Sequence, residues 1–230
     1  MDKSHVGTNT KIKITILILT VALLLLVAYL FTPNDRGGRE VDHDTVCIRH
    51  LRGIHRWFVE YHKVTGTYLA SINLENGRLL SWRYILAKRK MAVTNMDIYY
   101  NWDLNEPWQD SFNTETLAFP DFVCYAEAHT SVQRKICDTS YLMLVHSEHS
   151  VFNLPDRAVI VIESSDSGIH WMEPKDINVE TLRKVDTPFG KGLLNSYHDG
   201  YIYALCKNGD IIRIYKNLPK DQVIAILEGK

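Results

Sequence analysis

Ten histidines are spread along the chain, and their imidazole nitrogens make them the first candidates for metal binding. His146 and His149 lie three residues apart, with Glu148 between them. The surrounding residues are typical of a strand end and a loop, whereas an H-E-x-x-H metalloprotease needs a helix and a different order of residues. His55 and His62 flank the apolar stripe of an expected helix, where partly covered boundary residues are common. We therefore predict no metal site and no cofactor.

Four oxygen-bearing residues are a second candidate, because such ligands suit calcium: Glu163, Asp199, Asn208 and Asp210. They do not follow the Asp-x-Asp-x-Asp-Gly spacing of a calcium loop. Roles in turns and helix caps account for each of them more simply.

Hydrolase chemistry would need a nucleophile in a setting such as Gly-x-Ser-x-Gly. The nearest match is Ser167-Gly168, with Asp166 and His170 close by in the sequence. This polar stretch separates two β-rich runs, however, and such a composition is typical of a hairpin loop. The sequence therefore predicts no catalytic residue and no enzymatic activity.

A dense aromatic group lies within residues 99–108, interleaved with amides and acids. Aromatic faces beside amides and acids can stack sugars or peptides, and the best surface candidates for such binding are Tyr99, Tyr100 and Trp102. Three other tryptophans are expected to anchor the core, because a large ring contributes much buried area: Trp82, Trp108 and Trp171.

The four cysteines are Cys47, Cys124, Cys137 and Cys206. An even number outside the cytoplasm permits two disulfides, in three possible pairings. No C-x-x-C pair occurs, so a zinc ribbon is not expected. Cys124 and Cys137 close a short loop and are the preferred disulfide candidates. Four buried thiols remain the alternative.

The apolar run at residues 14–31 contains no charged residue. A helix rises 1.5 Å per residue, so a run of about this length, extended by Ile12 and the stem of Lys13, crosses a hydrocarbon core of roughly 30 Å. The run is longer than the apolar part of a signal peptide, and no small-x-small cleavage site follows it. We therefore expect a retained transmembrane helix at residues 12–31.

Charges on either side of this run predict its orientation. Three lysines precede it and two arginines follow it: Lys3, Lys11, Lys13, Arg36 and Arg39. This weak positive-inside bias places a tail at residues 1–11 in the cytoplasm and the bulk of the chain outside it. The expected location is the cell membrane, with a single span and an extracytoplasmic C-terminal domain.

Composition and the positions of proline and glycine indicate how the rest of the chain is divided into a linker and a domain. The chain has 230 residues, of which 46% are hydrophobic and 23% charged, as in globular proteins. A net charge of −1 argues against nucleic-acid binding, which normally needs a basic excess. Residues 32–43 are a linker, with Pro33 and Gly37-Gly38 as breakers. Residues 44–230 suffice for one domain with its own core.

A helix is expected directly after the linker, with Asp44 as its N-cap and Gly66 at its end. Apolar residues recur at spacings of 4, 3, 4 and 3, which places them on one stripe: Cys47, Leu51, Ile54, Phe58 and Tyr61. Such a stripe must pack on an apolar partner, and the β-rich remainder of the chain supplies a sheet. The expected fold class is α+β, with this helix packed on a mainly antiparallel sheet.

Short β-rich runs with turn residues between them predict the strands of this sheet. Asn76-Gly77 supplies a turn signal between residues 68–74 and 79–80, and the expected strands lie at residues 141–145, 158–163, 169–172, 201–206 and 211–215. Asn208-Gly209 between the last two is a hairpin signal, with Asn208 expected in the left-handed conformation of a type I′ turn. Further helices are expected from Ser81, from Thr94 through residues 96–100, and from Pro219.

Several segments, taken in order, carry a resemblance to known proteins. They are CIRHLRGIHRWFVEYHKVTG at 47–66, SWRYIL at 81–86, LNEPWQDSFN at 104–113, FVC at 122–124, TSYLMLV at 139–145, AVIVIESSDSGIHWMEPKDI at 158–177, and His198 followed by Asn208-Gly209. In this order and spacing they resemble a large family of bacterial envelope proteins of unknown function, which have a pilin-type N-terminal helix and a C-terminal H-x9-D-G motif. The residues that match the family motifs are Trp82, Trp108, Trp171, His198, Asn208 and Gly209.

The resemblance implies a pseudopilin-like protein with a structural or interaction role and no established enzymatic activity. Its implied contacts are the membrane, through residues 12–31, and other envelope proteins. Residues 11–31 contain neither glycine nor glutamate, so the family's usual processing motif is absent and cleavage by a prepilin peptidase is not expected. Asn208 stands where the family usually has aspartate. The alternative is a membrane-anchored module that binds a sugar or a peptide through residues 99–108.

Overall fold

The computed structural model describes residues 43–75, 78–94, 120–124, 138–146 and 151–230. All of these belong to one compact unit, Asp42–Lys230. The expected membrane span at residues 12–31 lies outside the described residues, as does the aromatic group at residues 99–108. Among the helices that the structure describes, none combines the length and the apolar character that a membrane crossing requires.

The first described helix, α2, covers His43–Thr65 and confirms the helix expected after the linker. Gly66, with φ of 71°, ends the helix, and its N–H donates to the carbonyl oxygen of His62 at 2.8 Å. The buried side chains follow the expected stripe, joined by one neighbour: Val46, Cys47, Leu51, Ile54 and Phe58.

Five strands form the central sheet, in the order β5-β3-β4-β6-β7. They cover Tyr141–Val145 (β3), Val159–Glu163 (β4), Ile177–Asn178 (β5), Tyr201–Cys206 (β6) and Ile211–Tyr215 (β7). Neighbouring strands are antiparallel except for the short β5, which runs parallel to β3. The expectation of an α+β fold with a mainly antiparallel sheet is confirmed.

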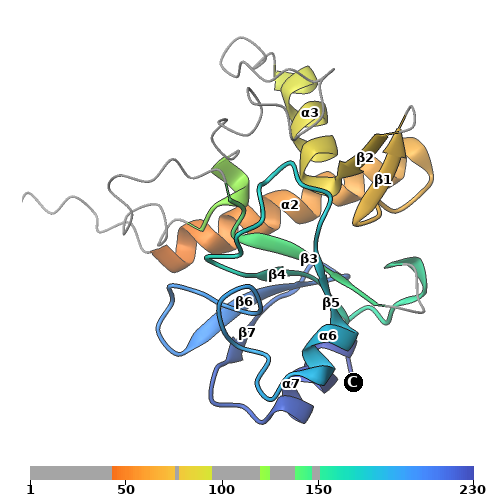
Figure 1. The fold of residues 1–230 in the computed structure, drawn as a ribbon. Coiled ribbons are helices and arrows are strands. Elements are labelled where there is room, and N and C mark those ends of the chain that lie inside the picture. The colour runs from red at the N-terminus through yellow and green to blue at the C-terminus, as the bar shows by residue number, and fades with distance from the viewer. Residues whose placement is uncertain (1–42, 76–77, 95–119, 125–137, 147–150) are drawn as a thin grey trace, which may run out of the picture. The chain divides into compact units, whose positions relative to one another are not determined.

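Both faces of this sheet are covered, which explains why its strands read as continuous apolar runs. In β3, Tyr141 and Met143 face the core that contains α2, whereas Leu142 and Leu144 face a second core. Two short helices lie over that second core, α6 at Val179–Lys184 and α7 at Lys220–Glu228 (Figure 1). The sheet therefore separates two apolar layers.

The start of each short helix has a local cause. α7 begins directly after Pro219, as the sequence predicted. α6 follows β5 with Asn178 as its N-cap, and the side-chain oxygen of Asn178 accepts a hydrogen bond from the N–H of Glu180 at 2.7 Å. Neither β5 nor α6 was predicted, because both are too short to show an apolar period.

One predicted strand is wrong. Within the run Ile169–Met172, His170 forms an isolated bridge with Asp138, Trp171 and Met172 lie in a turn, and Ile169 has no regular structure. Trp171 is nevertheless completely buried. The apolar residues of this run are buried in the core without forming a strand, so composition alone predicted the wrong local structure.

The β6–β7 hairpin is present where Asn208-Gly209 predicted it, but its turn differs from the expected one. Among the described residues, the one non-glycine position with positive φ is Asp166, so Asn208 does not adopt the left-handed conformation. Gly209 does, with φ of 94°, and its N–H donates to the carbonyl oxygen of Cys206 at 2.9 Å. This is a type I turn followed by a glycine at positive φ.

A second, smaller sheet precedes the central one. β1 (Ile72–Glu75) pairs antiparallel with β2 (Arg78–Ser81), and helix α3 (Trp82–Thr94) follows directly. The hydroxyl of Ser81 accepts a hydrogen bond from the N–H of Tyr84 at 3.1 Å, which confirms Ser81 as the cap of this helix.

Arg83 and Asp176 form a buried ion pair that joins α3 to the segment before β5. Their side chains are completely buried and lie 2.7 Å apart. Arg83 also donates to the carbonyl oxygens of Trp171, Glu173 and Lys175. The carboxylate of Asp176 accepts from the N–H of Met143 at 2.8 Å and from side chains of Ser71 and Trp82. Both charges are thus fully hydrogen-bonded, which is the condition for burying them.

Candidate functional site

Four side chains with metal-ligating atoms meet where α2 packs on the sheet, and we refer to them as the buried tetrad: Cys47, Cys124, Glu163 and His198. Cys47 belongs to the buried stripe of α2, and Glu163 is the last residue of β4. Cys124 lies just after the 3-10 helix η2 (Pro120–Phe122), and His198 lies in the loop before β6. Four separate segments therefore build one site.

The atoms of the tetrad are close to one another. The sulfur atoms of Cys47 and Cys124 are 3.2 Å apart, and the Cys124 sulfur is 3.8 Å from Nε2 of His198. That same Nε2 is 3.6 Å from Oε1 of Glu163. One ligand atom from each residue lies within 4.8 Å of all the others. Each residue of the tetrad is buried from solvent.

Asp44 fixes the orientation of the His198 ring. Nδ1 of His198 lies 2.9 Å from Oδ1 of Asp44, and because a carboxylate only accepts, Nδ1 carries the proton. The ring is thereby turned so that Nε2 faces the sulfur of Cys124. Asp44 is held in turn by the Tyr201 hydroxyl at 2.7 Å and by the Arg213 guanidinium at 2.8 Å.

This role of Asp44 differs from the expected one. The sequence predicted a helix N-cap, but α2 begins at His43 and the Asp44 carboxylate accepts from side chains of the sheet. Burial raises the pKa of Asp44, yet the hydrogen bonds of Tyr201 and the positive charges of His198 and Arg213 outweigh it. The net pKa lies below the ordinary value, so the carboxylate is charged near neutral pH.

Glu163 is the carboxylic acid of the tetrad. Its side chain is completely buried, and Oε2 accepts a hydrogen bond from the N–H of Tyr203 at 3.1 Å. Oε1 has no hydrogen-bond partner and points to the space shared with His198. Burial raises the pKa of Glu163 to about 7. A buried carboxyl oxygen without a hydrogen bond lowers the stability of the fold unless another group or an ion binds it.

Burial and close contact also shift the pKa values of the other ionisable groups in and around the tetrad. The hydrogen bond with Cys47, together with burial, raises the pKa of Cys124 far above its ordinary value. Burial also raises the pKa of Tyr141, whose side chain lies among the same residues. Burial alone would lower the pKa of His198, but Cys47, Glu163 and Asp44 raise it above its usual value.

Two thiols, an imidazole and a carboxylate are the ligands that zinc prefers in proteins. Because all four residues are buried, the arrangement suits binding of an ion better than reaction with a substrate from solvent. The sequence missed this site because its members are far apart in the chain; Cys47 and Cys124 are 77 residues apart. No short motif marks such a combination.

The histidines singled out in the sequence lie elsewhere. His146 Nε2 lies 3.2 Å from the carbonyl oxygen of Val159, and His149 lies outside the described residues. His62 stacks on Tyr68, with ring centroids 4.1 Å apart. These contacts are typical of boundary residues.

The structure does not bring the calcium candidates together. Glu163 belongs to the tetrad, whereas the side chains of Asn208 and Asp210 bond to each other at 2.7 Å in the hairpin turn. Asp199 is exposed in the loop before β6. The turn role that the sequence favoured for Asn208 and Asp210 fits this arrangement.

Ser167 is engaged in a turn. Its hydroxyl donates to the carbonyl oxygen of Thr139 at 2.7 Å and accepts from the N–H of Ile169 at 3.1 Å. His170 is also buried, and its Nδ1 accepts from the N–H of Met172 at 3.3 Å. These hydrogen bonds fix the turn that carries Ser167 and His170.

The preferred disulfide, between Cys124 and Cys137, remains a prediction because Cys137 lies outside the described residues. Among the cysteines that the structure describes, Cys47, Cys124 and Cys206 are buried, and no two of them form a disulfide. The thiol that Cys124 contacts is that of Cys47. Trp82 and Trp171 lie completely buried in the core, and Trp108 is outside the described part of the chain.

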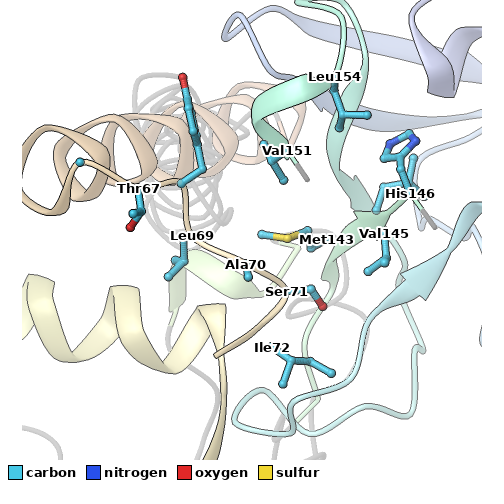
Figure 2. Close-up of a pocket in the computed structure, with 13 residues that line it drawn as sticks. Thr67, Leu69, Ala70, Ser71, Ile72, Met143, Val145, His146, Val151 and Leu154 are labelled. Atoms are coloured by element: carbon cyan, nitrogen blue, oxygen red, sulfur yellow. The ribbon is translucent and has the colours of Figure 1, made fainter. Parts of the chain in front are cut away.

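A separate pocket opens beside β3, with a volume of about 580 Å³. Figure 2 shows the stretch from Thr67 to Ile72 facing residues of β3 across this hollow. Most of its lining is apolar, and the side chains with polar atoms are those of Thr67, Tyr68, Ser71 and His146. Its size is within the range of small-ligand sites. The aromatic candidates Tyr99, Tyr100 and Trp102 lie outside the described residues.

Comparison with known proteins gives no match for this chain among protein families, curated proteins or solved structures.

Proposed function

We propose that this chain is a single-pass, membrane-anchored envelope protein whose exported domain has a structural or interaction role of the pseudopilin kind. The observation that carries the proposal is the packing of a 23-residue helix, α2, on a mainly antiparallel sheet through one apolar stripe. This helix follows an uncharged apolar run at residues 14–31 after a short linker. A membrane helix followed by a helix on such a sheet is the arrangement that the family resemblance implies.

The site geometry supports contact in preference to catalysis. The tetrad is closed to solvent, and the local bonds of Ser167 serve a turn. The domain also exposes apolar side chains near the end of α2 and on the first hairpin, at Val64, Ile72 and Leu79. Large apolar side chains that stay exposed on a domain are candidate contact points for a partner.

Anchoring is tested by expressing the full chain with a C-terminal tag in a bacterial host and separating the membrane fraction. We expect the chain in the membrane after alkaline carbonate washing, with a tag that protease digests in spheroplasts. Leu24→Arg/Leu25→Arg should release it, because each arginine costs about 2.5–3.5 kcal/mol at the centre of a span. Leu24→Ile/Leu25→Ile is the matched control. An unaltered chain found in the aqueous fraction would overturn the proposal.

The interaction role is tested by placing a photo-crosslinking amino acid at single surface positions of the anchored chain. Val64 and Leu79, which are exposed, should give a discrete crosslinked product with an envelope protein. Asp221, exposed on α7, is the control position and should give none. Equal labelling at all three positions would contradict a specific surface.

The pocket beside β3 favours a second candidate, an anchored module that binds an apolar group such as an aliphatic peptide side chain. Its apolar lining is better suited to such a group than to a sugar. The fluorescence of an apolar dye, anilinonaphthalene sulfonate, should rise on binding, and Ala70→Phe should abolish the rise by filling the pocket. Val64→Phe adds the same ring outside the pocket and should leave binding unchanged.

A further inference from the structure

We infer that the buried tetrad is a structural binding site for a zinc-type divalent cation. The proposal rests on the geometry of the tetrad and is independent of the anchoring and interaction roles proposed above. It differs from what the sequence predicted, which was no metal site.

The first argument is the spacing of the four ligand atoms. Zinc bonds of about 2.0–2.3 Å in a tetrahedron place neighbouring ligand atoms about 3.3–3.8 Å apart. The distances in the tetrad are 3.2 Å between the two sulfurs, 3.8 Å from sulfur to imidazole nitrogen, and 3.6 Å from that nitrogen to the carboxylate. The other three pairs of ligand atoms lie within 4.8 Å of each other, so closing the tetrahedron requires the two sulfurs to move about 0.5 Å apart and the wider pairs to approach by up to about 1 Å.

The second argument is the partner of His198 on its far side. Metal-bound histidines usually donate their other ring nitrogen to a carboxylate, which fixes the tautomer and aims the free nitrogen at the metal. Asp44 occupies this position, 2.9 Å from Nδ1, while Nε2 faces the tetrad. Asp44 is itself fixed by Tyr201 and Arg213, so the ring orientation is set before any ion binds.

The third argument is the unpartnered oxygen of Glu163. This side chain is completely buried, and its Oε1 has no hydrogen bond although it faces Nε2 of His198. A disulfide between Cys47 and Cys124 would leave that oxygen and the nitrogen unexplained. A cation bound by all four residues would satisfy both, and it would displace the two thiol protons to solvent.

The composition of the tetrad selects the class of ion. Two thiolates exclude calcium and magnesium, which require oxygen ligands, and the mixed sulfur, nitrogen and oxygen set suits zinc. With four protein ligands the coordination is complete, so no position is left for substrate. The ion would join α2 and the segment after η2 to the end of β4 and the loop before β6.

The experiment uses the full chain, purified in detergent without chelator and under reducing conditions. We expect about one zinc per chain by mass spectrometry of the metal content. After removal of zinc, cobalt(II) should give a thiolate-to-cobalt charge-transfer band and the intense visible bands of tetrahedral coordination. These readouts report ligand identity and do not depend on any activity.

Substitutions at and around the tetrad locate the ion. Cys124→Ser should remove the charge-transfer intensity of one thiolate and weaken zinc binding by at least about 100-fold. Asp44→Asn, which changes only the partner of His198, should weaken it by about 10–100-fold. Cys206→Ser is the matched control, since Cys206 is also a buried thiol but is not part of the tetrad.

Three results would overturn the inference. They are the absence of the charge-transfer band in reduced wild-type protein, retention of the full band in Cys124→Ser, and recovery of Cys47 and Cys124 as a disulfide from protein trapped with an alkylating agent. If Cys124→Ser fails to fold, the wild-type cobalt spectrum and the isosteric Glu163→Gln variant still decide the question. Glu163→Gln should keep the thiolate band and shift the visible bands.

Discussion

Gly209 shows how a single residue is fixed by its surroundings. Its φ is 94°, and a Cβ atom added there would lie 2.6 Å from the ring of His55 on α2. The backbone of the β6–β7 turn therefore lies so close to the His55 ring that only a residue without a side chain fits there. This position needs glycine for two independent reasons.

We predict that Gly209→Ala lowers the free energy of unfolding by about 1–3 kcal/mol, because it adds strain at positive φ and a contact with His55. Urea denaturation of the full chain measures the change. His55→Ala in the same background should recover the contact part of the loss and leave the strain part. Gly192→Ala is the control, since Gly192 has φ of 75° with no atom within 4 Å of the added Cβ. Equal losses at both glycines would refute the contact with His55.

The site residues show where prediction from sequence stops. Ser81 and Pro219 were identified as helix starts because capping depends on neighbours along the chain. The partnership of Asp44 with Tyr201 spans 157 residues, and no local pattern encodes it. The tetrad was missed for the same reason, although each of its members is conspicuous as a residue type.

The ion pair between Arg83 and Asp176 links two elements of the fold, because it joins helix α3 to the segment that leads into β5. Removing one partner of a buried pair leaves an uncompensated charge. We predict that Asp176→Asn lowers the free energy of unfolding by about 3–5 kcal/mol in a denaturation experiment.

An exposed ion pair provides the comparison. Lys63 and Glu60 on α2 lie 3.1 Å apart, with side chains 64% and 46% exposed. Glu60→Gln should change the free energy of unfolding by less than about 1 kcal/mol. If Asp176→Asn costs no more than this surface change, the buried pair does not hold the elements together.

Helices α6 and α7 are joined by an ion pair between Arg183 and Glu228. The hydrogen bond with Lys230, followed by that with Arg183, lowers the pKa of Glu228 below its usual value of 4.5. A lowered carboxylate pKa stabilises the fold above the unfolded value, and this contribution is lost as the pH falls through the folded value. Glu228→Gln should therefore destabilise the protein by about 0.2–1 kcal/mol at pH 7 and by nothing at pH 2, as measured by thermal unfolding. A difference that persists at pH 2 would exclude this cause.

The elements that were predicted correctly are those with a repeated pattern. α2 carries one apolar stripe over about four turns, and β3, β4, β6 and β7 are apolar runs bounded by turn residues. β5 and α6 were missed because their formation depends on pairing with β3 and on packing under the sheet. The strand predicted at 169–172 is absent because the apolar residues of this run are buried without pairing in a sheet.

At the scale of the whole molecule, one sheet supports two cores. α2, Trp82 and Trp171 lie on one side, and α6 and α7 lie on the other. Because β3, β4 and β6 each contribute residues to both layers, we expect the two cores to unfold together.

We predict that far-UV circular dichroism and tryptophan fluorescence of the full chain report one coincident unfolding transition in urea. Trp82 and Trp171 lie in the core with α2, whereas the dichroism includes the helices of both layers. Two separated midpoints would show that the layers unfold independently.

The contact between Cys47 and Cys124 has a consequence for how the chain matures in an oxidising compartment. In the unfolded polypeptide these thiols are separated by 77 residues, whereas Cys137 is only thirteen residues beyond Cys124. Closing the shorter loop is favoured by about 1.6 kcal/mol of chain entropy, or roughly fifteenfold. The link between Cys124 and Cys137 would therefore form first, and it would withdraw Cys124 from Cys47, so the predicted disulfide and the inferred zinc site are mutually exclusive states of the chain.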